Sequence, residues 1–482
     1  MMAEHKHLVE QGARLVELRL DYINGDVNVR RLLADRPCPV VIACRRDRDG
    51  GKWSGSEESR RLLLRTAIAE GADYIDLEDD IAAEIPRYGQ CKRIISHHDF
   101  RKTPDDLDSL HQRLCALDPD IVKIACMANH PRDNLRMLEL VRRSSVPMIG
   151  LCMGDIGLPT RILGGKFGVP FTYATFHHER ALAPGQLSYQ QMSEVYRYES
   201  IGPDTEVFGV VADPVGHSLS PLIHNAAFKH FGMNRVYVPF RVPREDLGQF
   251  IDEAPALGVR GLSVTIPHKE AVIAKLTEVD GAVRGIGACN TVVYEGEKRL
   301  GFNTDYCAAM SSLEDALRIP PGTEKPLSGK TALVLGSGGV GMAIAFGLIR
   351  RGARVVVTDG LSKQSAALAQ RLGCVAVDWN ARHNVSPDLL FNCTPVGMHP
   401  EVDATPFEKH YLKPSMLVFD AVYNPENTLL IKEARSRNCT VVTGVDMFVR
   451  QACLQFKHFA GIDGPAELMR DVIKRATSAA KH

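Results

Sequence analysis

The stretch "RIISHHDF" (Arg93–Phe100) begins with the apolar pattern of a buried strand and ends in titratable side chains. Two isoleucines are followed at once by a serine, two histidines and an aspartate. Such an end is either an ordinary polar loop or the mouth of a catalytic site. The surrounding sequence decides between the two, because the same pattern recurs along the first half of the chain.

Seven short apolar runs alternate with helical periodicity in this half, and several are rich in β-branched residues. The alternation predicts parallel strands joined by helices. In five of the runs, charged or imidazole side chains gather near the carboxyl end, where a (β/α)8 barrel carries its active site. We therefore expect a barrel rather than an open sheet. The runs cover residues 15–21, 39–45, 73–78, 93–98, 120–126, 147–154 and 171–176.

An eighth run is missing, and the chain opens with a helical segment that leads directly into the first run. A barrel of seven strands would leave two edges with unpaired backbone groups. We therefore expect the first strand to precede residue 1 and translation to start upstream. In-frame codons for a short β-branched strand would support this expectation, and a stop codon just before Met1 would exclude it.

Length and composition limit the classes of protein that fit. A chain of 482 residues is too long for one ordinary domain. Lys+Arg and Asp+Glu both number 58, so there is no basic excess for nucleic acid or an anionic membrane. Twelve cysteines without a CxxC pair argue against structural zinc and for a reducing compartment. The amino terminus has no signal or transit character, which favours the bacterial cytoplasm over a plastid.

The second half shows two further α/β blocks after a linker at "YRYESIGPDTE" (196–206). One block opens with "VFGVVAD", and the other opens near "LSGKTALVLGSGGVG". The uncharged stretch Thr331–Ile349 fits a strand, a glycine turn and a helix better than a membrane span. We expect domains at residues 1–200, at 206–310 together with C-terminal helices 445–480, and at 311–444.

Lys123 lies inside the apolar run "DIVKIAC" of the first half. Burial lowers the pKa of a lysine, and a neutral amine can form a Schiff base with a ketone. The alternative is a structural lysine that extends to solvent or pairs with Glu78. His98 is a proton shuttle near neutral pH, and Glu78 could orient its imidazole. Arginines able to grip a carboxylate are Arg19, Arg45 and Arg161.

Six motifs in order, "VELRLD", "YIDLE", "SHHDF", "DIVKIA", "TRILGGKFG" and "APGQLS", resemble the type I 3-dehydroquinate dehydratases across residues 8–190. The resemblance implies that Lys123 forms an imine with the C3 ketone of 3-dehydroquinate. His98 would take the neighbouring proton and help expel the hydroxyl as water, and Glu78 would hold His98. His98 is preferred to His97 because the family varies at the latter position. The substrate-binding residues implied are Glu17, Arg19, Arg45, Arg161 and Gln186.

Two features depart from this family. Leu182 stands where the family usually has a serine, so one substrate hydrogen bond is lost or comes from elsewhere. The first strand of the family, which also contributes to the site, is absent. A dehydratase half disabled by that loss therefore stays open as an alternative.

In the second half, "DPVGHSLSPLIHNAAF" (213–228) reads as a loop followed by a helix. The hydroxyls of Ser218 and Ser220 beside a helix start could bind an anion, or could simply cap the helix. "GLSVTIPHKEAV" (261–272) places Lys269 just after a strand. "GACNTVV" and "GFNTDYCAA" add polar residues that are also ordinary turn formers. These are Asn290, Asn303 and Asp305.

The stretch "VLGSGGVG" (334–341) has the strand and glycine turn of a dinucleotide-binding fold. Asp359 and Gly360 end the following strand, "VVVTDG". An acidic residue there hydrogen-bonds the free ribose 2′-hydroxyl of NAD and repels the 2′-phosphate of NADP. We therefore predict that NADH is at least competitive with NADPH. The glycines expected at the cofactor are Gly336, Gly338 and Gly339.

Together these motifs resemble the shikimate dehydrogenases over residues 206–475. The resemblance implies hydride transfer between a nicotinamide and C3 of shikimate, with Lys269 and Asp305 acting on the hydroxyl proton. That family usually has Asn-Arg-Thr where this chain has Asp359, so family and residues disagree on the cofactor. Ser263 stands where bacterial members often have asparagine. The resemblance implies substrate binding by Ser218, Ser220, Thr265, Asn290 and Gln451, and nicotinamide binding by Thr394 and Gly444.

The chain thus resembles a fusion of a barrel-type dehydratase with a two-lobed shikimate dehydrogenase that ends in a Rossmann domain. Its expected ligands are 3-dehydroquinate, 3-dehydroshikimate, shikimate and NADP or NAD, with no metal. One alternative is a catabolic quinate/shikimate dehydrogenase that runs oxidatively with NAD. Another is a regulator that binds these metabolites without turnover, although such a protein would not need Lys123, His98, Lys269 and Asp305 together.

Overall fold

The computed structural model describes residues 1–177, 183–216, 218–360 and 362–479. The chain divides into two compact units, which are treated separately below. One unit comprises Met1–Glu206 with Val238–Leu257, and the other comprises Val207–Tyr237 with Gly258–His482. The finer division into three domains stays a prediction. Leu182, the residue that departs from the dehydratase motif, lies outside the described residues.

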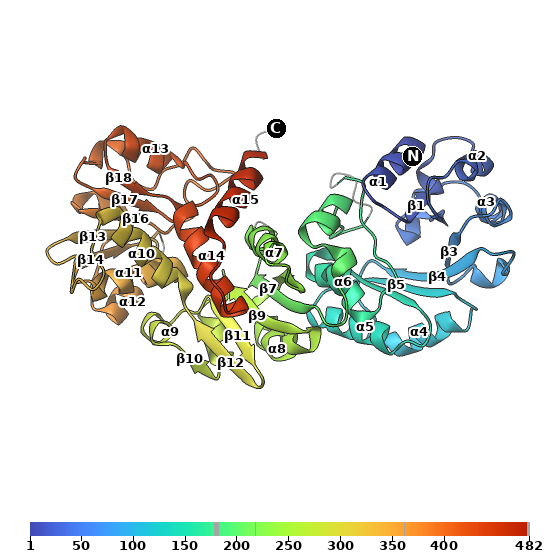
Figure 1. Cartoon of the computed structure of the whole chain (residues 1–482), viewed down its shortest axis with the longest axis horizontal. Coiled ribbons are helices and arrows are strands. Elements are labelled where there is room, and N and C mark those ends of the chain that lie inside the picture. Colours follow the sequence, from blue (N-terminus) through green and yellow to red (C-terminus); the bar gives the residue numbers. More distant parts are fainter. Residues whose placement is uncertain (178–182, 217, 361, 480–482) are drawn as a thin grey trace. The chain divides into compact units, whose positions relative to one another are not determined.

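The first sheet has six parallel strands in chain order, β1 to β6 (Figure 1). Its strands are buried on both faces, as expected of parallel strands covered by crossover helices. The prediction of a barrel-type α/β sheet is confirmed. The strands are β1 (Val16–Arg19), β2 (Val40–Ala43), β3 (Tyr74–Glu78), β4 (Lys92–Asp99), β5 (Ile121–Met127) and β6 (Met148–Met153).

Helices lie between most of these strands, although only the short 3-10 turn Ala82–Glu84 separates β3 from β4. Side-chain caps fix where several of the helices begin. Asn28, Ser56 and Asp106 each accept a hydrogen bond from the backbone N–H three residues further on. The helical segment expected before the first run is present as α1. The helices are α1 (Met2–Glu10), α2 (Val29–Ala34), α3 (Glu57–Ala69), α4 (Leu107–Cys115), α5 (Arg132–Arg143) and α6 (Gly154–Phe167).

The seventh predicted run, 171–176, is not a strand, and this prediction is wrong. Its backbone bonds to the following loop instead of extending the sheet. Thr175 N donates to Leu187 O over 2.8 Å, and Tyr189 N donates to Thr175 O over 2.8 Å. The six-stranded sheet therefore ends at β1 on one side and at β6 on the other.

The second sheet is mixed, with the order β10-β12-β11-β9-β7-β8. β7 and β9 are parallel, whereas β11 is antiparallel to both β9 and β12. Helices α7 and α14 contribute to one apolar core with β7. The strands are β7 (Glu206–Ala212), β8 (Arg235–Arg241), β9 (Val259–Val264), β10 (Glu278–Val279), β11 (Thr291–Glu295) and β12 (Lys298–Phe302). The helices are α7 (Ser220–His230), α8 (Leu247–Glu253), α9 (Gly281–Ile286), α10 (Thr304–Leu317), α14 (Gly444–Ala460) and α15 (Ala466–Ala479).

The third sheet is wholly parallel, with the order β15-β14-β13-β16-β17-β18. This is the strand order of the dinucleotide-binding fold, whose switch point lies between β13 and β16. The predicted Rossmann domain is confirmed. The strands are β13 (Thr331–Leu335), β14 (Arg354–Thr358), β15 (Val375–Ala376), β16 (Leu389–Asn392), β17 (Leu417–Asp420) and β18 (Thr440–Val442). The helices are α11 (Gly339–Arg350), α12 (Ser362–Leu372) and α13 (Leu429–Ser436).

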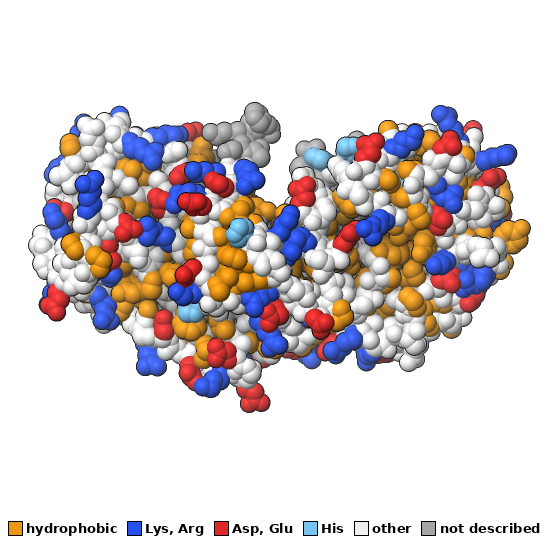
Figure 2. Space-filling view, viewed as in Figure 1, with side chains coloured by type: hydrophobic (Ala, Val, Ile, Leu, Met, Phe, Trp, Pro, Cys, Tyr) orange, Lys and Arg blue, Asp and Glu red, His pale blue; other side chains and the backbone are white. Residues whose placement is uncertain are grey.

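The stretch Thr331–Ile349 forms β13, the glycine turn and most of α11. Within the described part of the chain, no helix is both long and apolar enough to cross a bilayer. On the face shown in Figure 2, basic and acidic side chains are interspersed. This mixture agrees with the formal net charge of zero.

Candidate active sites

A cavity of about 70 Å³ in the first unit collects most of the residues predicted for the first reaction. The strands that contribute to it are β1, β4, β5 and β6. Further residues come from the loop after β2 and from α6. Of the eight predicted residues, only Glu78 does not line the cavity. The seven that do are Glu17, Arg19, Arg45, His98, Lys123, Arg161 and Gln186.

Lys123 is held deep in this cavity by a carboxylate that the sequence analysis did not single out. Its Nζ lies 2.9 Å from Oδ2 of Asp76, and its side chain is 6% exposed. The ring of Tyr173 lies 4.0 Å from Nζ, so the amine is shielded from water. Burial lowers the pKa of Lys123 below its ordinary value, although the charge of Asp76 opposes that shift. The neutral amine needed for attack on a ketone is therefore more accessible than in an exposed lysine.

Asp76 on β3 connects the neighbouring strands β4 and β5 and the loop after β2. It accepts hydrogen bonds from Lys123 Nζ, from Arg45 Nη2 over 2.5 Å and from Ser96 Oγ over 2.6 Å. Burial alone would raise the pKa of this carboxyl, but Arg45 and Lys123 hold the pKa below its ordinary value. Alternation along "DYIDLE" places Asp76 on the same face of β3 as Glu78, and that signal could have found it.

His98 lines the cavity, whereas its neighbour His97 turns away to Asp79, 3.2 Å from its Nδ1. The Nδ1 atom of His98 lies 3.1 Å from Arg45 Nη1. Because a guanidinium only donates, Nδ1 is the acceptor of this hydrogen bond. Burial, followed by the charges of Arg45 and Lys123, lowers the pKa of His98 well below its ordinary value. The imidazole is therefore neutral at physiological pH.

Among the described residues no hydrogen bond joins Glu78 to His98, so the role of Glu78 in holding His98 stays a prediction. Glu78 Oε2 accepts a hydrogen bond from Arg60 Nη1 over 2.8 Å. Arg60 on α3 is fully buried and requires carboxylate partners, which Glu57 and Glu78 provide. The carboxylate closest to the reacting groups is therefore Asp76 rather than Glu78.

The arginines differ in how much of their binding capacity is already used. Arg19 donates from Nε and Nη2 to Asp21 over 2.9 and 2.7 Å, so this pair of guanidinium donors is already used within the protein. Arg161 pairs with no carboxylate among the described residues, and its buried Nε has no hydrogen-bond partner there. Burial without a nearby negative charge lowers the pKa of Arg161 to about 10. Arg161 is therefore the arginine best placed to receive an anionic ligand.

In the second unit, Lys269 and Asp305 form a direct pair, with Nζ 2.6 Å from Oδ2. Asn290 is connected to this pair by a hydrogen bond to the backbone next to Asp305. Its Oδ1 accepts from Thr304 N over 2.8 Å, immediately before Asp305. Asn303 caps α10 by accepting from Tyr306 N over 3.0 Å, which fixes the start of the helix that carries Asp305. The structure thus brings three of the predicted residues together.

The other predicted substrate residues are less closely connected. Ser218 Oγ accepts from Ser220 N over 3.3 Å, as in the capping alternative, and α7 begins at Ser220. Gln451 donates to Phe448 O within its own helix over 3.1 Å. Over the described ranges, no hydrogen bond joins these three residues or Thr265 to the Lys269–Asp305 pair.

Gln455, which the sequence analysis missed, connects α14 to the group around Asn290. It accepts from Ser263 Oγ over 2.8 Å and donates to Asn290 O over 3.0 Å. Tyr237 in turn donates to Ser263 Oγ over 2.6 Å. Gln455 follows Gln451 by four residues, so both lie on the same face of α14. That spacing was the available signal.

The glycine turn after β13 has the close approaches that a nucleotide requires. Gly336 has a φ of 101°, and a Cβ on Gly341 would lie 2.0 Å from Gly336 O. A Cβ on Gly339 would lie 2.7 Å from Lys269 Cδ, so this turn packs against Lys269. Helix α11 begins there without a side-chain cap, which leaves its first N–H groups for a phosphate.

Asp359 lies against the same turn, where Oδ2 accepts from Ser337 N over 2.7 Å and from Ser337 Oγ over 2.6 Å. Thr394 follows β16 at the switch point and donates to Asn392 from its backbone N over 3.0 Å. Gly444 begins α14, where a Cβ would lie 2.1 Å from Val422 O. The cofactor residues predicted from sequence therefore lie at the edge where this fold binds a dinucleotide.

Comparison with known families divides the chain in the same way as its motifs. Residues 1–203 match the family described as type I 3-dehydroquinase. Residues 210–292 match the shikimate dehydrogenase substrate binding domain. Residues 444–474 match the shikimate 5'-dehydrogenase C-terminal domain.

A relative in Arabidopsis thaliana, a bifunctional 3-dehydroquinate dehydratase/shikimate dehydrogenase of the chloroplast, is 39% identical over 98% of this chain and 82% of its own length. The structure of shikimate 5-dehydrogenase from Thermus thermophilus with NADP(H) and shikimate matches with a TM-score of 0.50 and 33% identity, over 56% of this chain and 99% of that chain. The structure of quinate dehydrogenase from Corynebacterium glutamicum with NAD matches with a TM-score of 0.51 and 30% identity, over 56% and 99%.

Proposed function

Because the chain belongs to the family of bifunctional 3-dehydroquinate dehydratase/shikimate dehydrogenases, we propose that its halves catalyse consecutive reactions. The first dehydrates 3-dehydroquinate to 3-dehydroshikimate, and the second reduces that product to shikimate. The observation that carries the proposal for the first half is the buried Lys123–Asp76 pair. The same cavity holds the cation of Arg161, which pairs with no carboxylate in the described part of the chain.

In the first reaction, the neutral amine of Lys123 adds to the substrate ketone and water leaves, which forms an imine. The imine acidifies the adjacent C–H by accepting its electron pair. His98 takes that proton and returns it to the departing hydroxyl, which leaves as water. Hydrolysis of the imine releases the enone and restores Lys123. Since Arg45 donates to His98 Nδ1 in the free protein, the base role requires bound substrate to draw Arg45 away.

In the second reaction, a reduced nicotinamide, when bound, supplies the hydride that reduces the ketone of 3-dehydroshikimate. The chain itself supplies the proton and the orientation. Lys269 and Asp305, 2.6 Å apart, exchange the proton of the new hydroxyl. Asn290 sits beside this pair and orients the ring hydroxyls. The glycine turn after β13 and the start of α11 hold the dinucleotide phosphates.

We also propose that NADH is at least competitive with NADPH as the cofactor. Asp359 projects onto the glycine turn, and Gly360 supplies no cation for a 2′-phosphate. The similar solved structures include one with bound NADP(H) and one with bound NAD. The same carboxylate supports a second candidate function, oxidation of quinate or shikimate with NAD. Steady-state kinetics on quinate separate the two.

The proposed compartment is a reducing one, such as the cytoplasm. All twelve cysteines are free thiols, and several are buried where a thiol behaves as a small apolar side chain. Oxidised cysteines in protein isolated directly from cells would contradict this proposal.

A coupled assay tests both activities at once. Purified protein is mixed with 3-dehydroquinate and either NADH or NADPH, and loss of reduced nicotinamide is followed by absorbance. Oxidation requires dehydration and then reduction, so a signal establishes both halves and ranks the cofactors. If only 3-dehydroshikimate gives a signal, the dehydratase half is inactive. Silence with both substrates would overturn the enzymatic proposal in favour of a binding protein.

A further inference from the structure

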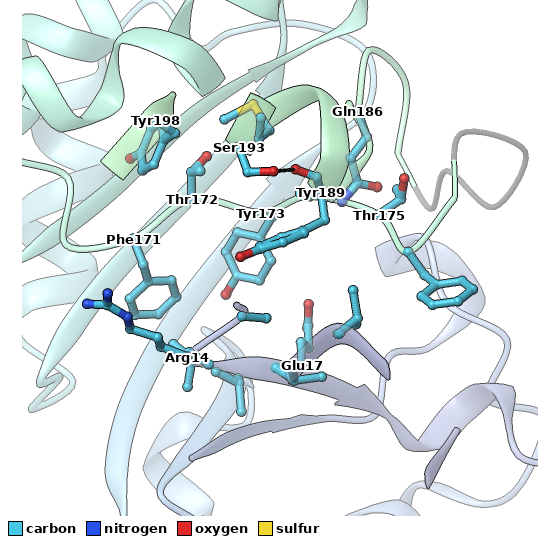
Figure 3. A pocket seen from close by; sticks show the side chains of 18 of the residues that line it. Arg14, Glu17, Phe171, Thr172, Tyr173, Thr175, Gln186, Tyr189, Ser193 and Tyr198 are labelled. Carbon is cyan, nitrogen blue, oxygen red and sulfur yellow. Dashed lines mark hydrogen bonds between the residues drawn. The ribbon is translucent and has the colours of Figure 1, made fainter. Parts of the chain in front are cut away.

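Buried polar groups that neither proposed mechanism uses occur in both units. In the first unit, Glu17 Oε1 and Tyr173 Oη have no hydrogen-bond partner within the described ranges, and both residues line a cavity of about 900 Å³ beside β1 (Figure 3). The same two residues also line the catalytic cavity, so they belong to the site already described. In the second unit, Asp420 at the end of β17 is 0% exposed and belongs to neither candidate site.

Asp420 is held by three hydrogen bonds from uncharged donors. Oδ1 accepts from Asn392 Nδ2 over 2.9 Å and from Val422 N over 3.0 Å, and Oδ2 accepts from Thr428 Oγ1 over 2.6 Å. Burial raises the pKa of this carboxyl to about 6, and the hydrogen bonds oppose that shift, so the group is ionised at neutral pH. A buried carboxylate is costly to the folded state. Its position at the dinucleotide-binding edge of the sheet therefore indicates a function beyond packing.

Asn392 connects Asp420 to the loop after β16. The two residues lie opposite each other in the paired strands β16 and β17. A carboxylate only accepts hydrogen bonds, so it directs the Nδ2 side of the Asn392 amide toward itself and the Oδ1 side toward Thr394. Oδ1 then accepts from Thr394 N over 3.0 Å and from Thr394 Oγ1 over 2.7 Å. The charge of Asp420 therefore fixes the backbone and the hydroxyl of Thr394.

Val422 connects Asp420 to the other residue predicted at the nicotinamide. Its N–H donates to Asp420, which fixes the turn after β17. Its carbonyl oxygen lies against Gly444, where a Cβ would be only 2.1 Å away. Gly444 is the first residue of α14, whereas Thr394 follows β16. One carboxylate thus lies behind both predicted nicotinamide contacts, although they come from separate segments of the chain.

We propose that Asp420 is a positioning residue of the reductase half, which holds the Thr394 loop and the contact between Val422 and Gly444 in place for the nicotinamide ring. The proposal rests on the proposed function of the second half, because only a bound nicotinamide gives these two contacts a role. The phosphates bind at the glycine turn after β13, to which Asp420 makes no hydrogen bond in the described part of the chain. Loss of the Asp420 charge should therefore weaken the contacts of the nicotinamide ring and leave those of the remaining dinucleotide intact.

The test is Asp420→Asn in the full chain. All three partners of Asp420 donate, so one N–H of the amide at residue 420 must face a donor, and the Asn392 amide loses its fixed orientation. The Kd for NADH or NADPH is expected to rise about tenfold, and kcat for reduction of 3-dehydroshikimate to fall about 100-fold, because a small displacement of the ring disturbs hydride transfer. The Kd for the corresponding fragment without nicotinamide, ADP-ribose or its 2′-phosphate, should stay within twofold.

Two further changes separate positioning from folding. Thr428→Val removes one hydrogen bond to Asp420 and should lower kcat about tenfold, whereas Thr428→Ser keeps the hydroxyl and should leave kcat within twofold. Asp388→Asn is the matched control, because Asp388 accepts from Thr331 N over 2.9 Å at the opposite edge of the same sheet, where β13 and β16 begin. This control should change neither kcat nor the Kd for the cofactor.

Unchanged kcat and an unchanged Kd for the whole cofactor in Asp420→Asn would overturn the proposal. If Asp420→Asn loses affinity for the cofactor and for its nicotinamide-free fragment in parallel, the domain is damaged and the Thr428 variants decide. A lower kcat in Thr428→Val alone then supports the proposal, and equal kcat in the two variants overturns it. If the unchanged protein reduces no 3-dehydroshikimate, the proposed function fails, while the ratio of the two Kd values still decides the role of Asp420.

Discussion

The amine of Lys123 lies 2.9 Å from the carboxylate of Asp76, and both side chains are almost completely excluded from solvent. Neither charge is exposed, so each depends on the other and on Arg45, which donates to the same oxygen of Asp76. Breaking one partner of such a pair leaves an uncompensated charge in the interior. The dehydratase half is therefore most sensitive at a residue that no substrate needs to touch.

Asp76→Asn should damage both stability and catalysis. Removing one partner of a buried charge group costs about 3 kcal/mol, and a displaced Lys123 costs about 100-fold in turnover. Urea unfolding and the rate of dehydration measure the two effects. Asp79→Asn is the matched control, because Asp79 pairs with His97 and Arg113 outside the cavity. Dehydration within twofold of the unchanged protein would show that Asp76 does not position Lys123.

Lys123 should be the residue that forms a covalent bond with substrate. Borohydride added with 3-dehydroquinate is expected to reduce the imine and leave a stable mass increase on the peptide that contains Lys123. Because burial lowers the pKa of Lys123 from 10.5, trapping should reach its plateau at a pH below that of an ordinary lysine. Lys123→Met should abolish the adduct while reduction of 3-dehydroshikimate by the second half continues. An adduct on another lysine contradicts the assignment.

His98 should make the first unit less stable in mild acid. Its pKa is lower in the folded protein than in the unfolded chain, so the unfolded state binds the proton first. Stability is complete above about pH 6.5 and falls as the pH drops below that value, by at most about 1.4 kcal/mol per pH unit. His98→Gln should reduce this slope between pH 7 and pH 5 in urea unfolding. His97→Gln, outside the cavity, is the control, and equal slopes in the two variants would refute the prediction.

Arg161→Met should separate binding from folding. Loss of a charged hydrogen-bond donor to the substrate carboxylate raises KM for 3-dehydroquinate about 30-fold. Stability should rise by about 1 kcal/mol, because a buried cation without a carboxylate partner is replaced by an apolar side chain. Arg142→Met on exposed α5 surface is the control for loss of charge. A fall in stability with unchanged KM would make Arg161 a structural residue.

Asp359 should set the choice of cofactor. Asp359→Asn combined with Gly360→Arg removes the repulsion and adds a phosphate partner, so KM for NADPH should fall at least about tenfold while KM for NADH rises. Gly360→Ala is the matched control, since a Cβ at this position meets nothing within 4 Å. Initial rates with 3-dehydroshikimate give both constants. A clear NADPH preference in the unchanged protein would contradict the prediction.

Local patterns were sufficient for most of the architecture. Apolar runs and glycine turns identified six strands of the first sheet and the strands β13 and β14 of the Rossmann sheet, because strand and turn preferences depend on near neighbours in sequence. The motifs also named seven residues that line one cavity. This prediction succeeded because the carboxyl ends of parallel strands lie at one edge of the sheet, whatever the order of the strands in it.

Pairing across the sheet could not be predicted in this way. Asp76 and Glu78 lie on the same face of β3, and only register and the neighbouring helix decide which of them meets Lys123. Buried Arg60 on α3 takes Glu78, which leaves Asp76 for the lysine. Run 171–176 has the composition of a strand, yet its backbone bonds to the following loop. The sequence by itself determined the elements and the chemical groups at their ends. The tertiary structure alone decided their partners and the open edge of β1, because partners far apart in sequence are chosen by register and by competition for buried charge.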